Sequence, residues 1–99
     1  EDAKLLESTG CFALVLEKVP AALAQKVAET ISIPVIGIGA GSGVDGQVLV
    51  THDLLGMTHE FSPRFLRRYL SLFDEITGAI KEYVQDVKSV DFPNEKEQY

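Results

Sequence analysis

Two short, uninterrupted apolar runs mark the first half of the chain. They cover residues 11–16 and 33–38, and neither alternates between apolar and polar positions. Because each run is short for a helix, we predict two strands buried on both faces, as in a parallel sheet. Between them, apolar residues recur at helical spacing at Leu23, Val27 and Ile31. The pattern therefore predicts a strand–helix–strand unit with parallel strands.

A further helix is predicted before the first strand, over residues 2–9. Gly10 follows it, and glycine is the usual residue at the left-handed stop of a helix. After the second strand comes a glycine-dense loop over residues 39–46. A short, irregular and mostly buried helix is expected around Leu54 and Leu55. Helices and strands thus alternate, as in α/β proteins.

The second half of the chain is predicted to be helical. Ser62 and Pro63 are typical of a helix start, and apolar positions then recur at helical spacing as far as Val87. One long helix is possible on this pattern, but we prefer two, because Asp74 is able to begin a second one. Residues 89–99 are predicted to be a loose tail.

The predicted sheet lacks neighbours for its strands. Two parallel strands buried on both faces need further strands beside them, and no other convincing strand is found in the pattern. The chain also opens abruptly inside the first predicted helix. We therefore interpret residues 1–99 as one segment of a single larger α/β domain.

Composition excludes several classes of function. Nine basic residues against 15 acidic ones give a net charge of −6, which disfavours binding to nucleic acid or to an anionic membrane surface. No apolar run approaches the ~18 residues that span a bilayer. Cys11 is the single cysteine, so no internal disulfide can form, and a reducing compartment such as the cytoplasm is expected.

Glu17 is the first candidate for chemistry. It follows the apolar run 11–16 directly, so it is predicted at the carboxyl end of a buried parallel strand. In α/β barrels that end carries the active site, and a rigidly held carboxylate there suits a general base. The alternative is a solvated acid that pairs with Lys18 or Lys26, and position alone leaves both open.

The glycine loop is less specific. Residues 41–46 match the dinucleotide-binding pattern G-x-G-x-x-G, but no second strand ending in an acid follows about twenty residues later. The loop is either a tight connection or a place where backbone approaches a ligand closely. The histidines and acids at 52, 53, 59 and 60 fit no standard zinc spacing, so no metal site is predicted among them.

The order of these segments resembles the ketopantoate hydroxymethyltransferase family. The similarity lies in Leu-Val-Leu-Glu-Lys-Val-Pro at 14–20, Ile-Pro-Val-Ile-Gly-Ile-Gly-Ala-Gly at 33–41, Asp-Gly-Gln-Val-Leu-Val at 45–50 and His-Asp at 52–53. It extends to Phe92-Pro93 near the end of the chain. The second run joined to Asp-Gly-Gln is highly specific.

The resemblance implies a (β/α)₈ barrel of the phosphoenolpyruvate/pyruvate class. Residues 1–99 would be its C-terminal part, with the seventh strand, its helix, the eighth strand and the terminal helices. The implied reaction is hydroxymethyl transfer from 5,10-methylenetetrahydrofolate to 3-methyl-2-oxobutanoate, giving 2-dehydropantoate in pantothenate biosynthesis. Mg²⁺ is implied as the cofactor, and a homo-oligomer, typically a decamer, as the assembly.

The resemblance also implies roles for particular residues. Glu17 stands in the family's Leu-Glu-x-Val-Pro segment and would be the proton acceptor. Gly39 and Gly41 are expected to offer loop backbone to the substrate because of their position, directly after a buried strand at the active face. Family members often have cysteine where this chain has Lys18. The Mg²⁺ ligands are expected on earlier strands, so no metal ligand is assigned within residues 1–99. Two alternatives are another Mg²⁺-dependent keto-acid barrel enzyme and a non-catalytic oligomerisation segment.

Overall fold

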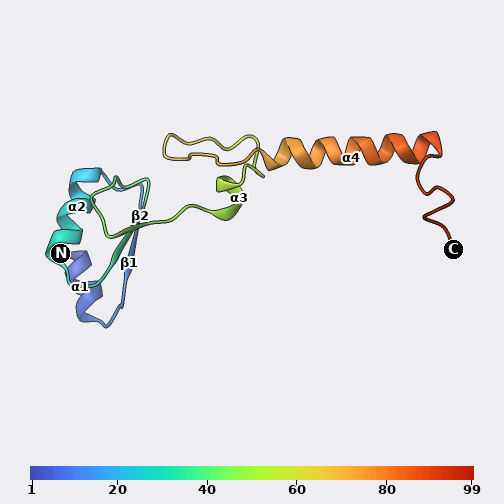
Figure 1. The fold of residues 1–99 in the computed structure, drawn as a ribbon. Helices are drawn as coiled ribbons and strands as arrows, with labels where there is room; N and C mark the ends of the chain where they lie inside the picture. The colour runs from blue at the N-terminus through green and yellow to red at the C-terminus, as the bar shows by residue number, and fades with distance from the viewer.

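Three parallel strands form one sheet in the order β1–β2–β3 (Figure 1). The computed structural model describes residues 1–99, and the strands are β1 (Leu14–Glu17), β2 (Val35–Ile38) and β3 (Gly46–Gln47). The predicted parallel strand–helix–strand unit is confirmed, although both long strands are shorter than the apolar runs that predicted them.

The prediction of only two strands is wrong. Gly46 and Gln47 pair in parallel with Ile36 and Gly37, and so add a third strand at the edge of β2. A strand of two residues contains no periodicity to detect. Its pairing is made by backbone groups that the glycine loop brings back to the sheet, which local sequence does not specify.

Helix α2 (Ala21–Thr30) covers one face of the sheet, and α1 (Asp2–Ser8) precedes β1 as predicted. The apolar stripe of α2 packs at the sheet, so that Ile31, Leu14 and Val35 form the core cluster. Gly10 follows α1 with φ +94°, the conformation expected of a glycine at this stop.

The opposite face of the sheet is uncovered in this chain. Side chains alternate along a strand, and in β1 Leu14 is buried on the side of α2 whereas Val15 is 64% exposed. The expectation that the strands are buried on both faces is therefore not met by residues 1–99 alone. An apolar strand residue left open in this way is typical of a sheet whose second cover lies elsewhere.

The region between residues 55 and 71 is not helical, contrary to the prediction from Ser62 and Pro63. Helix α3 is one turn (Thr51–Leu54), and α4 runs over Leu72–Ser89. The reason is long-range backbone pairing. The N–H groups of Tyr69, Leu72 and Phe73 donate to the carbonyls of residues 54, 55 and 56, at 2.9–3.0 Å, instead of to carbonyls one helical turn earlier.

Helix α4 begins two residues before Asp74 and is followed by a residue with left-handed backbone. Asp74, predicted to begin the second helix, lies in the first turn of α4, and its carboxylate accepts a hydrogen bond from Ser71 Oγ at 2.8 Å. Val90 follows the helix in a left-handed conformation with φ +63°. Residues after Val90 form no helix or strand. The helix around Leu54 and Leu55 is confirmed as short, but both residues are only half-buried.

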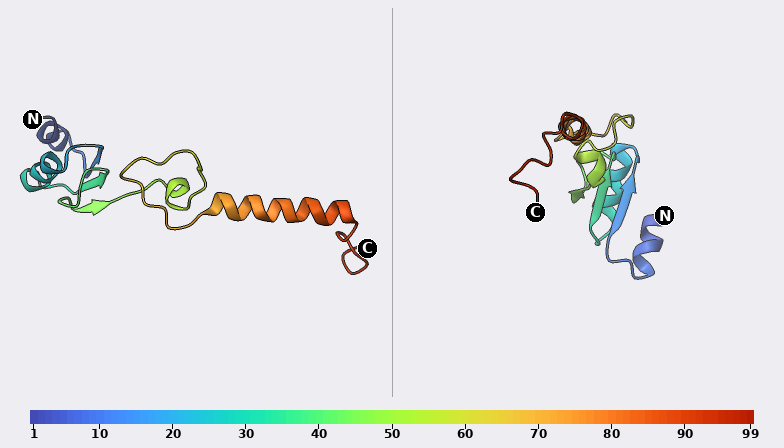
Figure 2. Two further views of the ribbon diagram at one scale, coloured as in Figure 1. Left: turned by 90° about the horizontal axis from the view of Figure 1, so that it is seen from above. Right: turned by 90° about the vertical axis from the view of Figure 1, so that its right-hand side faces the viewer.

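The molecule is elongated, with α4 projecting away from the sheet (Figures 1 and 2). Its extents are 67 × 29 × 16 Å and its radius of gyration is 22.2 Å, against about 13 Å for a compact chain of this length. Only seven of 99 residues are buried. No helix combines the length and the apolar character needed to cross a membrane. The α/β segment thus exposes apolar surface that a complete domain would bury.

Candidate functional site

Glu17 is the last residue of β1 and lies opposite Ile38, the last residue of β2. The two strands therefore end at the same level, at the edge where parallel α/β sheets carry their ligands. Strand alternation puts Glu17 on the same side as Val15, away from α2. The carboxylate is exposed in this chain. The predicted place of Glu17 at the carboxyl end of a strand is confirmed, while its role as a base stays a prediction.

The turn after Glu17 has an unusual backbone. Lys18 has φ +53°, one of two non-glycine residues with positive φ, and its N–H donates to the Ile38 carbonyl at 2.9 Å. A left-handed conformation is uncommon for a residue with a Cβ. The bond extends the pairing of β1 and β2 one residue past the strand, and the turned backbone leads into Pro20 at the start of α2. Glu17 is thus held between a paired strand and a fixed turn.

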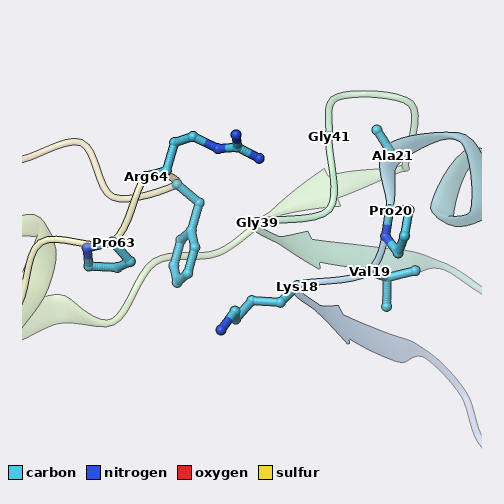
Figure 3. Close-up of a pocket in the computed structure, with 9 residues that line it drawn as sticks. Lys18, Val19, Pro20, Ala21, Gly39, Gly41, Pro63 and Arg64 are labelled. Atoms are coloured by element: carbon cyan, nitrogen blue, oxygen red, sulfur yellow. The ribbon is translucent and has the colours of Figure 1, made fainter.

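A cleft of about 740 Å³ lies at this edge of the sheet. Figure 3 shows its lining, which comes from the β1–α2 turn, the glycine loop and the loop between α3 and α4: Lys18, Val19, Pro20, Ala21, Gly39, Gly41, Pro63, Arg64 and Phe65. The structure therefore brings Gly39 and Gly41 together beside the residue that follows Glu17. Glu17 itself is not part of the lining.

Gly39 and Gly41 are both positions that exclude other residues. Their φ angles are +64° and +80°, which side chains rarely adopt. A Cβ on Gly39 would come within 2.9 Å of the Phe65 ring, and a Cβ on Gly41 would come within 2.5 Å of the Ala21 Cβ. The glycines let the loop pack directly against α2 and against the α3–α4 loop. Close packing is therefore an established role of these glycines, whereas contact with a substrate stays a prediction.

Two polar side chains hold the glycine loop in place. The N–H of Val35 donates to the Asp45 carboxylate at 2.8 Å, and the N–H of Asp45 donates back to the Val35 carbonyl at 3.0 Å. Gln47 Nε2 donates to the carbonyl of Gly41 at 2.8 Å. Neither role was predicted from the sequence. The available signal was the short Asp-Gly-Gln segment directly after the glycines.

Residues 63–65 were also missed, because they were predicted to begin a helix. Arg68 explains how they reach the cleft instead. Its guanidinium donates to the carbonyls of Thr58, His59 and Phe61, at 3.0, 3.2 and 2.5 Å, and so closes the loop on itself. Charged hydrogen bonds of this kind are stronger than neutral ones. The closed loop brings residues 63–65 back toward Gly39.

The remaining titratable groups do not assemble into a metal site. No group of three or more His, Cys, Asp or Glu side chains is placed to hold a metal ion. His59 stacks on Phe73 with ring centroids 4.7 Å apart, and Cys11 is a half-buried free thiol packed beside the core cluster. The residues of this chain therefore do not fit a Mg²⁺ site by themselves.

Comparison with known proteins matches one family along almost the whole chain. The family model of ketopantoate hydroxymethyltransferase matches residues 1–95. Proteins named 3-methyl-2-oxobutanoate hydroxymethyltransferase from Flavobacterium johnsoniae and Parabacteroides distasonis are each 71% identical over 99 residues. The protein of that name from Christiangramia forsetii is 71% identical over 98 residues. These matches cover 99–100% of this chain but 36% of each relative, so the chain spans about a third of their length.

Proposed function

This chain belongs to the ketopantoate hydroxymethyltransferase family, and we propose that its Glu17 is the general base of that enzyme. The substrate would be 3-methyl-2-oxobutanoate, whose C3 proton Glu17 removes. The cosubstrate would be 5,10-methylenetetrahydrofolate, and the product 2-dehydropantoate. The proposal applies to the longer protein in which residues 1–99 form one part.

The observation that carries the proposal is the position of Glu17. It ends β1 level with the end of β2, and it lies on the sheet face that α2 does not cover. In a (β/α)₈ barrel the helices cover the outer face, so the uncovered face is the interior. A carboxylate at the carboxyl end of an interior face is placed where barrels hold their reacting groups. If Glu17 were only a solvated acid that pairs with Lys18 or Lys26, it would have no need to lie on the face away from α2.

The proposed reaction begins with transfer of a proton to Glu17. The C3 proton of the keto acid goes to the Glu17 carboxylate, and the resulting enolate carbon forms a bond to the folate methylene carbon. Both C–N bonds of that methylene group break. Water supplies the new hydroxyl group, and the two protons left over end on the folate nitrogens. The part played by this chain is proton removal, which general bases accelerate by about 10²–10⁴-fold.

The same proposal places β1 and β2 as the seventh and eighth strands of a barrel. Their parallel pairing, the helix between them and the uncovered inner face all support that arrangement. The first strand of the barrel would then pair with β2 at the edge where the two-residue β3 now lies. It would either extend this pairing or replace β3. Cover for Val15 would come from the barrel interior.

Several further expectations depend on the family and on residues outside this chain. A Mg²⁺ ion that polarises a keto group would need ligands from outside residues 1–99, since no suitable cluster is present here. We expect a homo-oligomer, and a cytoplasmic enzyme. None of these enters the proton-transfer step assigned to Glu17.

Exchange of the keto acid's C3 proton with D₂O tests the proposal directly. The full-length protein is incubated with 3-methyl-2-oxobutanoate in D₂O without folate, and loss of the C3 proton signal is followed by NMR. We expect rapid exchange in the wild type and little in Glu17→Gln, because the amide keeps the shape but cannot take the proton.

Glu29→Gln is the matched control. It makes the same chemical change at an exposed residue of α2, where Glu29 accepts a hydrogen bond from Gln25. Exchange should continue at the wild-type rate in this variant. If Glu17→Gln exchanges as fast as Glu29→Gln, Glu17 is not the base.

A further inference from the structure

The cleft beside the base carries two cationic side chains and no acidic one. Lys18 comes from the β1–α2 turn and Arg64 from the α3–α4 loop, so segments 46 positions apart bring charge of one sign to the same cleft (Figure 3). The chain as a whole has a net charge of −6. Two cations without an acidic neighbour favour an anion in this cleft, although the net negative charge of the chain repels anions at long range.

The backbone around the cleft adds hydrogen-bond donors. Helix α2 begins at Ala21, and the first intrahelical N–H groups to be used are those of Leu23 and Ala24, which donate to the Pro20 carbonyl at 2.9 and 3.0 Å. The N–H groups of the two preceding residues are directed out of the helix start. The dipole of this ten-residue helix also favours negative charge at that end. These donors support the two cations but would not make a site without them.

We propose that Lys18 and Arg64 bind the carboxylates of the glutamate tail of the folate cosubstrate. This inference rests on the proposed function, which supplies methylenetetrahydrofolate as the cosubstrate. The ionised groups of that molecule are the carboxylates of its glutamate end. Its methylene carbon must meet the enolate formed at Glu17, whereas its glutamate end lies beyond the p-aminobenzoyl ring. Cations that bind this end must therefore line a cleft beside Glu17 rather than contact the base, and the cleft that contains Lys18 does not include Glu17.

The volume of the cleft favours the folate over the smaller keto acid. About 740 Å³ is within the range of clefts that bind molecules the size of a drug or cofactor. The keto acid has only eight non-hydrogen atoms and would leave most of that space empty. Its carboxylate is the competing occupant, and the test below separates the two.

Not every cation of the α3–α4 loop is available to bind an anion, and Arg68 is one that is not. Its guanidinium is occupied by three carbonyls of residues 58–61, which makes it a structural residue. Arg67 is exposed and does not line the cleft. Arg67→Gln therefore removes one positive charge from the same loop without changing the cleft, and it serves as the control.

The experiment uses the full-length enzyme and two forms of 5,10-methylenetetrahydrofolate, with one and with three glutamates. We expect Lys18→Gln and Arg64→Gln each to raise KM for the folate by about 5-fold, the size expected for one solvated charge contact. The increase should be larger for the three-glutamate form and should shrink at high salt. KM should stay at the wild-type value in Arg67→Gln.

Folate-free exchange in D₂O decides between the two anions. A rise in KM for the keto acid in that assay, with KM for folate unchanged, would assign the cations to the keto acid and overturn the proposal. An unchanged KM for both folate forms would overturn it as well. If wild-type exchange itself is absent, the proposed function fails, and direct titration with the two folates, followed by fluorescence, still shows whether the cleft binds glutamate carboxylates.

Discussion

Glu17 lies opposite Ile38 in the parallel register of β1 and β2, and the N–H of Lys18 donates to the Ile38 carbonyl at 2.9 Å. One backbone hydrogen bond therefore joins the residue after the proposed base to the residue before the glycine loop. Any change that moves the end of β2 will move Glu17 with it.

Two substitutions of Glu17 should distinguish the effect of its charge on catalysis from the effect of its position. Glu17→Asp keeps the carboxylate but withdraws it by one methylene group, whereas Glu17→Gln keeps the length and loses the charge. We expect kcat to fall by about 10²–10⁴-fold in Glu17→Gln and by less in Glu17→Asp, with little change in KM for the keto acid. Steady-state kinetics of the full-length variants measure this. A Glu17→Gln enzyme with wild-type kcat would contradict it.

Gly41→Ala should be far more damaging than Gly10→Ala. Both glycines have positive φ, at +80° and +94°, so each alanine carries about 1–2 kcal/mol of backbone strain. Only the Cβ on Gly41 would collide with α2, at Ala21, while nothing lies within 4 Å of a Cβ on Gly10. Overpacking adds about 1–3 kcal/mol. Denaturant unfolding and activity of the full-length protein test the difference, and equal losses in the two variants would refute it.

Asp45 should stabilise the glycine loop through its side chain. Asp45→Ala leaves the N–H of Val35 without the carboxylate that accepts its hydrogen bond, a loss of about 1–3 kcal/mol. Asp45→Asn retains an acceptor oxygen and should lose less. Urea unfolding of the full-length protein compares the two. If Asn and Ala destabilise equally, the charge of Asp45 rather than its hydrogen bond is what matters.

Residues 1–99 expressed alone should not unfold cooperatively. Only seven residues are buried, and Val15 and much of the apolar surface of α4 face outward. Burial on that scale cannot offset the conformational entropy of ordering the chain. Calorimetry of a monomeric sample is the measurement. A sharp heat-absorption peak would show that this segment is a folded unit without further cover.

The sequence by itself determined β1, α2 and β2. Apolar runs short of helical length predicted β1 and β2, helical spacing predicted α2, and the residue after the first run located Glu17 at a strand end. These features depend on neighbours a few positions away, where burial and backbone preference act along one short stretch. The parallel pairing followed from the same pattern, because a helix between two strands returns the chain to the end of the sheet where the first strand began.

Only the tertiary structure decided what surrounds Glu17. The bonds from Arg68 to residues 58–61, and the pairing of Tyr69 with Leu54, outcompete a helix that the local pattern favours. They bring Phe65 against Gly39 and Arg64 to the cleft. Hydrogen bonds and packing between residues distant in the chain leave no periodicity in the sequence. The segments that flank the candidate base therefore became visible only once the chain was folded.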